Sequence, residues 1–201
     1  MKKKKRRRKK YKRMASMAPM IAGAVVLVVL IVLIIFGIKG CGVSHKSPEG
    51  VVKALIESYV GGKESKIRDC YGAKKDADEE LQAMIDATIK YFEAHGTKKA
   101  NISECDILSE NKNYTYVYII YGLELENGQE YPCIATYMTA KEDGKYYVLS
   151  PSKVTEEMSK QAATDYAKFM TTDTYKKYTT DYETFIKKNP GYEEKIAGKV
   201  S

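Results

Sequence analysis

The sequence predicts an α+β protein in which an N-terminal transmembrane helix precedes helices packed on a four-stranded antiparallel meander, with a C-terminal helical extension. Three observations predict this class. An apolar run at 18–38 contains no charged residue. Apolar residues then recur at helical spacing from 47 to 94. From 99 to 149 they alternate instead, and Asn-Gly and Asp-Gly pairs mark tight turns between strands.

Residues 18–38 are long enough to cross a bilayer as a helix. At about 1.5 Å per residue, roughly 20 apolar residues span a hydrocarbon layer of about 30 Å. Eleven Lys and Arg residues lie between positions 2 and 13, and basic flanks stay cytoplasmic. We therefore expect a single-pass protein of the cell membrane, with a basic cytoplasmic tail at 1–17, a transmembrane helix at 18–38, a linker at 39–46 and an extracytoplasmic remainder.

Two alternatives share features with this anchor. A cleaved signal peptide has an apolar region of about 7 to 15 residues, which is shorter than the run found here. A lipoprotein signal would use Cys41 as its modified cysteine, but Lys39 stands where such signals carry a small or aliphatic residue. Both comparisons favour an uncleaved span.

The charge distribution argues against nucleic acid as a partner. The chain of 201 residues has 34 Lys and Arg, 26 Asp and Glu and a net charge of +8. Without the eleven basic residues of the tail, 23 basic and 26 acidic residues remain, so the external part carries about −3. Because nucleic-acid binding depends on clustered cations, we expect the tail to contact the lipid bilayer and its anionic headgroups instead.

Three helices are predicted before the sheet. Ser47-Pro48-Glu49 supplies an N-cap, a first-turn proline and an acid for the first helix, which Gly61-Gly62 ends. A second, short helix is expected at 64–71 and a third at 78–94, with Gly96 as its stop.

Four strands follow, at 100–108, 114–125, 130–140 and 145–149. Asn127-Gly128 and Asp143-Gly144 predict two-residue type I′ turns, because both central positions of such a turn need a positive φ. With Glu126 opposite Gln129, the expected pairs are Gly122 with Cys133, Tyr121 with Ile134, Ile119 with Thr136 and Val117 with Met138.

This register sorts the side chains onto two faces of the sheet. The aliphatic face, expected beneath the helices, holds Val117, Ile119, Tyr121, Leu123, Leu125, Ile134, Met138 and Leu149. The opposite face holds Tyr114, Tyr116, Tyr118, Ile120, Tyr131, Ala135, Tyr137, Tyr146 and Val148. The tyrosines of that face either pack beneath a C-terminal helix or form a ligand-binding wall, for which Tyr116, Tyr118 and Tyr137 are the candidates.

Helical spacing returns at Thr155. Thr180-Asp181-Tyr182-Glu183 has the form of a capping box and predicts the start of another helix, which Asn189-Pro190 ends. A last short helix is expected at 192–197. The folded domain is thus expected at 47–151 and the helical extension at 152–201.

This order of elements resembles the NTF2-like, or cystatin-like, α+β superfamily. The resemblance rests on Ser-Pro-Glu-Gly-Val-Val-Lys at 47–53, on Gly61-Gly62 before a second helix and on the meander, and it covers about residues 47–151. It implies an extracytoplasmic domain on a bacterial single-pass membrane protein. The superfamily includes ketosteroid-isomerase-like enzymes, dehydratases and non-catalytic binding domains, so the fold alone selects no function.

No catalytic, cofactor or metal motif stands out in the sequence. An isomerase of this fold would need a buried general base, whereas Asp106, Glu124 and Glu130 are expected in solvent near turns. His45 and His95 have no partner at metal-ligand spacing. We therefore expect a non-catalytic module that binds a small ligand or an envelope protein, with a ketosteroid-isomerase-like enzyme and a structural envelope subunit as alternatives.

Four cysteines, Cys41, Cys70, Cys105 and Cys133, lie on the expected external side. The register places Cys105 opposite Tyr118, and Tyr118 opposite Tyr137, so Cys105 and Cys133 should be about 16 Å apart. A disulfide needs Cα atoms within about 7 Å. We expect no bond between these two, and either three buried free thiols or a bridge that involves Cys70.

Overall fold

The computed structural model describes residues 42–73 and 77–200 of the chain. The predicted tail, the predicted transmembrane helix and Cys41 lie outside the described residues, as does the first part of the linker. From Val43 onward the chain forms one compact unit. Within the described ranges, no helix is both long enough and apolar enough to cross a membrane.

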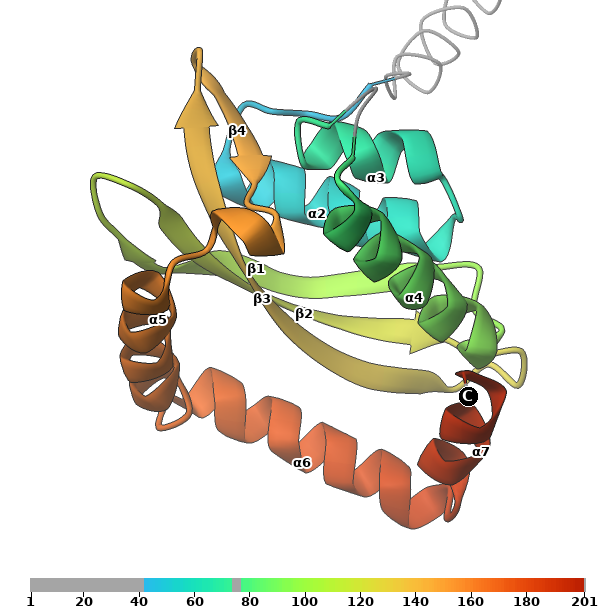
Figure 1. Cartoon of the computed structure of the whole chain (residues 1–201). Helices are drawn as coiled ribbons and strands as arrows, with labels where there is room; N and C mark the ends of the chain where they lie inside the picture. The colour runs from blue at the N-terminus through green and yellow to red at the C-terminus, as the bar shows by residue number, and fades with distance from the viewer. Residues whose placement is uncertain (1–41, 74–76, 201) are drawn as a thin grey trace, which may run out of the picture. The chain divides into compact units, whose positions relative to one another are not determined.

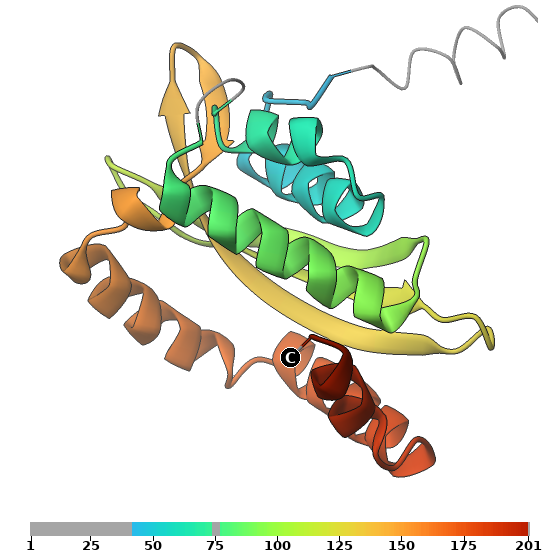
Figure 2. The same ribbon diagram turned by 45° about the vertical axis from the view of Figure 1, so that its right-hand side comes forward.

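The unit is a four-stranded antiparallel sheet between two groups of helices, shown in Figures 1 and 2. The strands β1 (Ala100–Glu110), β2 (Thr115–Glu124), β3 (Glu130–Glu142) and β4 (Lys145–Val148) follow one another in the sheet in chain order. The helices α2 (Pro48–Val60), α3 (Glu64–Cys70) and α4 (Glu79–His95) lie on one side. A 3₁₀ turn, η1 (Pro151–Lys153), leads to α5 (Glu156–Phe169), α6 (Asp173–Lys188) and α7 (Tyr192–Val200).

The three N-terminal helices begin and end where the sequence predicts. The Ser47 hydroxyl accepts a hydrogen bond from the Gly50 amide at the start of α2, and the Asp78 carboxylate accepts one from the Leu81 amide at the start of α4. Gly96, with a φ of 68°, ends α4 in the left-handed conformation that glycine adopts without strain. The described part of the linker is held to β4, because the Tyr146 amide donates to the His45 carbonyl at 3.0 Å.

The turn between β2 and β3 differs from the predicted type I′ turn. The Gly128 amide donates to the Leu125 carbonyl at 2.9 Å, and the Leu125 amide donates to the Gln129 carbonyl at 2.8 Å. The loop therefore has three residues, of which only Gly128 has a positive φ, 78°. This is a type I turn followed by a left-handed glycine, the other common hairpin geometry for an Asn-Gly pair. The Asp143-Gly144 turn, in contrast, has positive φ at both positions, 49° and 78°, as predicted.

The extra loop residue shifts the β2–β3 register by one position. Gly122 pairs with Pro132, Tyr121 with Cys133, Ile119 with Ala135 and Val117 with Tyr137. Because side chains alternate along a strand, a shift of one residue moves every β3 side chain to the opposite face. The predicted pairs, and the predicted faces of β3 and β4, are therefore wrong.

The correction redistributes the tyrosines between the two faces of the sheet. Ile134, Met138 and Leu149 leave the predicted aliphatic face, and Met138 and Leu149 pack with Tyr116 beneath α5. Five residues assigned to the tyrosine face belong instead to the main core, which includes residues of α2, α3 and α4 and also Phe185 of α6: Tyr131, Ala135, Tyr137, Tyr146 and Val148. That core also contains Val117, Ile119, Tyr121 and Leu123 of β2, as predicted.

Strand β1 forms one edge of the sheet. Its pairing with β2 is interrupted between Ile102 and Glu104 and again between Ile107 and Ser109. Such irregularities hinder a second chain from pairing along an exposed edge.

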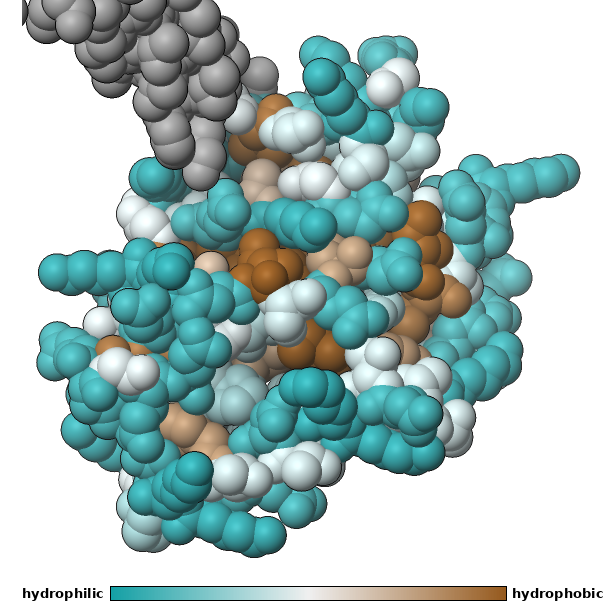
Figure 3. All heavy atoms as spheres, turned by 180° about the vertical axis from the view of Figure 1, so that it is seen from behind, coloured by the Kyte–Doolittle hydropathy of each residue, from teal (hydrophilic) through white to brown (hydrophobic). Residues whose placement is uncertain are grey.

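From behind, hydrophobic side chains show across the middle of the molecule with hydrophilic ones around them (Figure 3).

The three described cysteines, Cys70, Cys105 and Cys133, are free thiols. Cys105 pairs with Ile119 on β2, and Ile119 pairs with Ala135 on β3. Cys133 lies two residues from Ala135 along β3, whereas the predicted register places Cys133 four residues from the residue aligned with Cys105. Burial raises the pKa of each of the three thiols to about 12, which keeps them protonated and unreactive near neutral pH.

The second predicted C-terminal helix starts earlier than the capping-box pattern indicated. Helix α6 begins after Thr172, whose hydroxyl accepts a hydrogen bond from the Tyr175 amide at 3.3 Å. Thr180 lies inside the helix, where its hydroxyl donates to the Lys176 carbonyl. The Thr180–Glu183 pattern therefore caps nothing, and the prediction of a start there is wrong.

Candidate functional site

The space between the N-terminal helices and the sheet is filled by side chains. Leu55, Ile56, Ile67, Ile85 and Ile119 are fully buried there. Polar groups in this layer include the hydroxyls of Tyr59 and Tyr71, which lie 3.4 Å apart, and the hydroxyls of Tyr121 and Tyr137, whose pKa values burial raises. The isomerase alternative requires a buried carboxylate in this space. Among the described acids, the buried one is Asp165, on α5. Asp69 of α3 is 15% exposed and lies 3.4 Å from His45 Nε2.

The three acids considered from the sequence, Asp106, Glu124 and Glu130, are exposed on strands. In the ranges 42–73 and 77–200, no three His, Cys, Asp or Glu side chains gather as they would around a metal ion. His45 bonds the Tyr146 carbonyl through Nδ1, and His95 Nδ1 lies 2.8 Å from the Tyr192 hydroxyl.

The candidate ligand-binding tyrosines do not form one wall. Tyr116 and Tyr118 lie on the face that α5 covers. There Tyr116 donates to the Thr136 hydroxyl, Tyr118 donates to the Glu104 carboxylate, and the Tyr118 ring packs on Phe169. Tyr137 projects from the opposite face into the main core. Only the first two can therefore contribute to a common surface.

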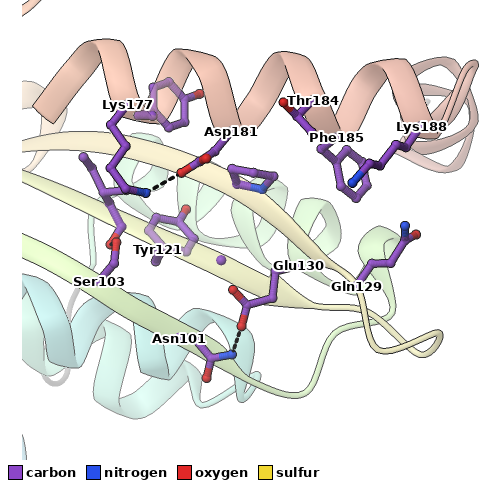
Figure 4. A pocket seen from close by; sticks show the side chains of 14 residues that line it. Asn101, Ser103, Tyr121, Gln129, Glu130, Lys177, Asp181, Thr184, Phe185 and Lys188 are labelled. Carbon is purple, nitrogen blue, oxygen red and sulfur yellow. Dashed lines mark hydrogen bonds and ion pairs between the residues drawn. The ribbon is translucent and has the colours of Figure 1, made fainter. Parts of the chain in front are cut away.

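An open groove lies on the same face of the sheet, farther along, beneath α6 (Figure 4). Its volume is about 430 Å³. Ser103, Ile120, Gly122 and Pro132 of the sheet form one wall, and α6 forms the other. We call this space the α6 groove.

Glycine at position 122 shapes the floor of the α6 groove. Because Gly122 has no side chain, the Glu130 side chain lies across β2, where its carboxylate accepts a hydrogen bond from the side-chain amide of Asn101 on β1. A Cβ at position 122 would come within 2.7 Å of a Glu130 carboxylate oxygen. The glycine thus lets polar groups of β1 and β3 meet over β2.

Helix α6 supplies charged and aromatic groups to the other wall. Lys177 and Asp181 pair across one helical turn at 2.6 Å, with both side chains largely exposed. Tyr178 is half-buried, and burial raises the pKa of its hydroxyl, which stays a neutral donor and acceptor. Phe185 and Lys188 continue the wall toward the end of the helix.

The chemistry of the α6 groove suits recognition of a polar partner. Amide, carboxylate, hydroxyl and ammonium groups line it together with three aromatic residues, and its carboxylates are exposed to solvent. Sequence reasoning missed these residues because α6 was expected to begin at Thr180 and no local pattern places a helix on a given sheet face. The available signal was Gly122 inside an otherwise bulky strand, since an interior strand glycine marks a close approach of other groups.

The sequence matches no family model, and no curated protein matches it. Among solved structures, similarity is found to a Campylobacter jejuni protein named as an NTF2-like transpeptidase, at 22% identity and a TM-score of 0.33. The match covers 52% of this chain and 98% of that protein. In the described part of this chain, three helices precede and cover a four-stranded antiparallel meander, which is an α+β arrangement.

Proposed function

We propose that the chain is a single-pass membrane protein whose extracytoplasmic NTF2-like domain binds a polar ligand or a segment of an envelope partner without catalysis. The α6 groove is the binding site in this proposal. The observation that carries it is a contrast between the two sides of the sheet. Side chains fill the helix-covered interior, where an enzyme of this fold would hold its substrate, whereas the opposite side has an open groove with hydrogen-bonding groups.

The ligand class follows from the lining of the groove. Asn101, Glu130, Asp181 and Lys188 offer both donors and acceptors, and the half-buried Tyr178 offers a ring surface. Sugar hydroxyls and extended peptides fit such a lining because they combine many hydrogen-bonding groups with small apolar faces. We therefore propose a glycan or a peptide segment of the cell envelope as the ligand.

Site-specific photocrosslinking in living cells tests the proposal. A photoreactive phenylalanine analogue placed at Tyr178, in the full-length protein, should form an adduct with a discrete envelope component. The same analogue at Tyr146, a half-buried tyrosine on β4 outside the α6 groove, is the matched control and should give no such adduct.

A variant of the groove floor makes the test specific. Gly122→Ala should displace the Glu130 side chain and reduce the Tyr178 adduct at least threefold, because the added Cβ has no room beside that carboxylate. Equal adducts at positions 178 and 146, or an adduct that Gly122→Ala leaves unchanged, would refute the groove as the site. Turnover of a ketosteroid by the purified protein would support the enzyme alternative instead.

A further inference from the structure

A second cavity, separate from the α6 groove, lies between the end of α4 and helix α7. Its volume is about 470 Å³, which falls within the range of small-molecule sites, about 300 to 1,000 Å³. Aromatic and aliphatic side chains dominate its lining: Tyr91, His95, Tyr131, Tyr192, Ile196 and Val200. We call this space the His95 cavity.

Contacts at both ends of α7 hold the walls of the His95 cavity in place. Near the start of α7, the Glu193 carboxylate accepts hydrogen bonds from the hydroxyls of Tyr131 on β3, at 3.0 Å, and Tyr182 on α6, at 2.5 Å. Near its end, the Lys199 ammonium donates to the Ala94 carbonyl in the last turn of α4 at 2.8 Å. The cavity is therefore bounded by elements that are bonded to one another, and a ligand would not have to order them.

Ring contacts gather around His95. Its ring centroid lies 4.7 Å from that of Tyr91, 4.9 Å from that of Tyr131 and 5.7 Å from that of Tyr192. These spacings are those of packed aromatic pairs, so no cation fits between the rings, and a ligand must lie against the cluster from the side of Ile196 and Val200.

His95 presents one unused polar atom. The residue is 7% exposed, and its Nδ1 is bonded to the Tyr192 hydroxyl at 2.8 Å. Its Nε2 is buried and has no hydrogen-bond partner among the described residues. Leaving such an atom unpaired costs about 1–3 kcal/mol, so a ligand group that pairs with it contributes to binding.

The charged groups near His95 already make hydrogen bonds within the protein. Glu193 is bonded to two tyrosines and Lys199 to a carbonyl. Burial, with a smaller contribution from Lys199, lowers the pKa of His95 to about 4, so the ring is neutral at physiological pH. A charged ligand would lose its hydration against this mainly apolar lining, and the Glu193 carboxylate is already engaged by two hydroxyls.

We propose that the His95 cavity binds a neutral, mainly aromatic ligand that carries one hydroxyl group, with the hydroxyl bonded to Nε2 of His95. A hydroxyl both donates and accepts, so it pairs with Nε2 in either tautomer of the ring. The aromatic body of the ligand lies against Tyr91 and Tyr131 and contacts Ile196 and Val200. This site is independent of the α6 groove and does not depend on the function proposed for it.

Binding of 2-naphthol to the full-length protein in lipid nanodiscs tests the proposal. The probe should shift the methyl NMR signals of Ile196 and Val200 saturably, after the free concentration is corrected with empty nanodiscs. Naphthalene should bind about fivefold more weakly because it lacks the hydroxyl. Charged 2-naphthoate should bind at least as weakly as naphthalene.

Two variants locate the site and the hydrogen bond. Val200→Trp places a large ring at the cavity rim and should weaken 2-naphthol binding at least tenfold, whereas Met170→Trp, at a similarly exposed position on another element, should leave it unchanged. His95→Phe keeps a ring but removes Nε2, so the preference for 2-naphthol over naphthalene should disappear. Absence of saturable shifts, equal effects of the two tryptophan variants, or a hydroxyl preference that persists in His95→Phe would each overturn the proposal.

Discussion

His95 is a buried histidine whose pKa, lowered to about 4 by burial and by Lys199, lies below the ordinary value near 6.5. Glu193, which also faces the ring, acts in the opposite direction and is the smaller influence. Because the unfolded chain takes up a proton near pH 6.5 and the folded chain does not, protonation favours unfolding. The stability linked to His95 is therefore complete above pH 6.5 and is lost as the pH falls from 6.5 toward 4.

Replacing His95 should remove this part of the pH dependence. Between pH 7 and pH 4, the free energy of unfolding should fall by up to about 3 kcal/mol more for the wild type than for His95→Phe, since each pKa unit corresponds to about 1.4 kcal/mol. Urea denaturation at both pH values measures the difference, in which the titration of the carboxylates cancels. An equal fall in the two proteins would show that His95 is not neutral in the folded state.

The residue scale also explains which tyrosines lie on the predicted face of the sheet. Tyr116 and Tyr118 were placed on the correct face because the alternation of β2 is uninterrupted from Thr115 to Glu124. Tyr137 was misplaced because its face depended on a turn one strand away. Gly128 supports either hairpin geometry, and the choice between two and three loop residues decides the orientation of every β3 side chain.

Among the elements, helices with a cap at each end were the most predictable. Helices α2 and α4 have a side-chain N-cap and a glycine C-cap, and the structure has both ends within about one residue of the prediction. For α6, two threonines competed as the start. No glycine or proline lies between Thr172 and Pro190, so nothing ends a helix before Thr180, and the capping-box pattern there stays inside the helix.

The two threonines of α6 offer a matched pair of substitutions. Thr172→Ala should lower the free energy of unfolding by about 1 kcal/mol, because the Tyr175 amide loses its hydrogen-bond acceptor at the helix start. Thr180→Ala should change it by less than about 0.5 kcal/mol, since Thr180 is exposed in the helix interior and alanine has the higher helix propensity. Urea denaturation of both variants measures this. A larger cost at Thr180 would restore the later helix start.

At the scale of the whole molecule, the α6 groove and the His95 cavity both depend on how the C-terminal helices lie around the sheet. Phe185 of α6 and Tyr192 of α7 pack on Tyr131 of β3, with ring centroids 5.2 Å from the Tyr131 ring in each pair. These contacts join residues more than 50 positions apart in the sequence. Local patterns predict such helices but not their placement, so neither site could be assembled from sequence alone.

The same scale holds the prediction of membrane topology. The eleven basic residues at 2–13 and the mildly acidic remainder favour a cytoplasmic tail and an extracytoplasmic domain. Protease added to intact spheroplasts should therefore remove an epitope tag at the C-terminus and spare one at the N-terminus, and permeabilised spheroplasts should lose both. Digestion of the N-terminal tag alone would reverse the assignment.

Because Lys39 breaks the lipoprotein pattern, Cys41→Ser should leave both the protease protection of the N-terminal tag and the size of the protein unchanged. A mature protein that starts at Cys41 would instead establish a lipoprotein.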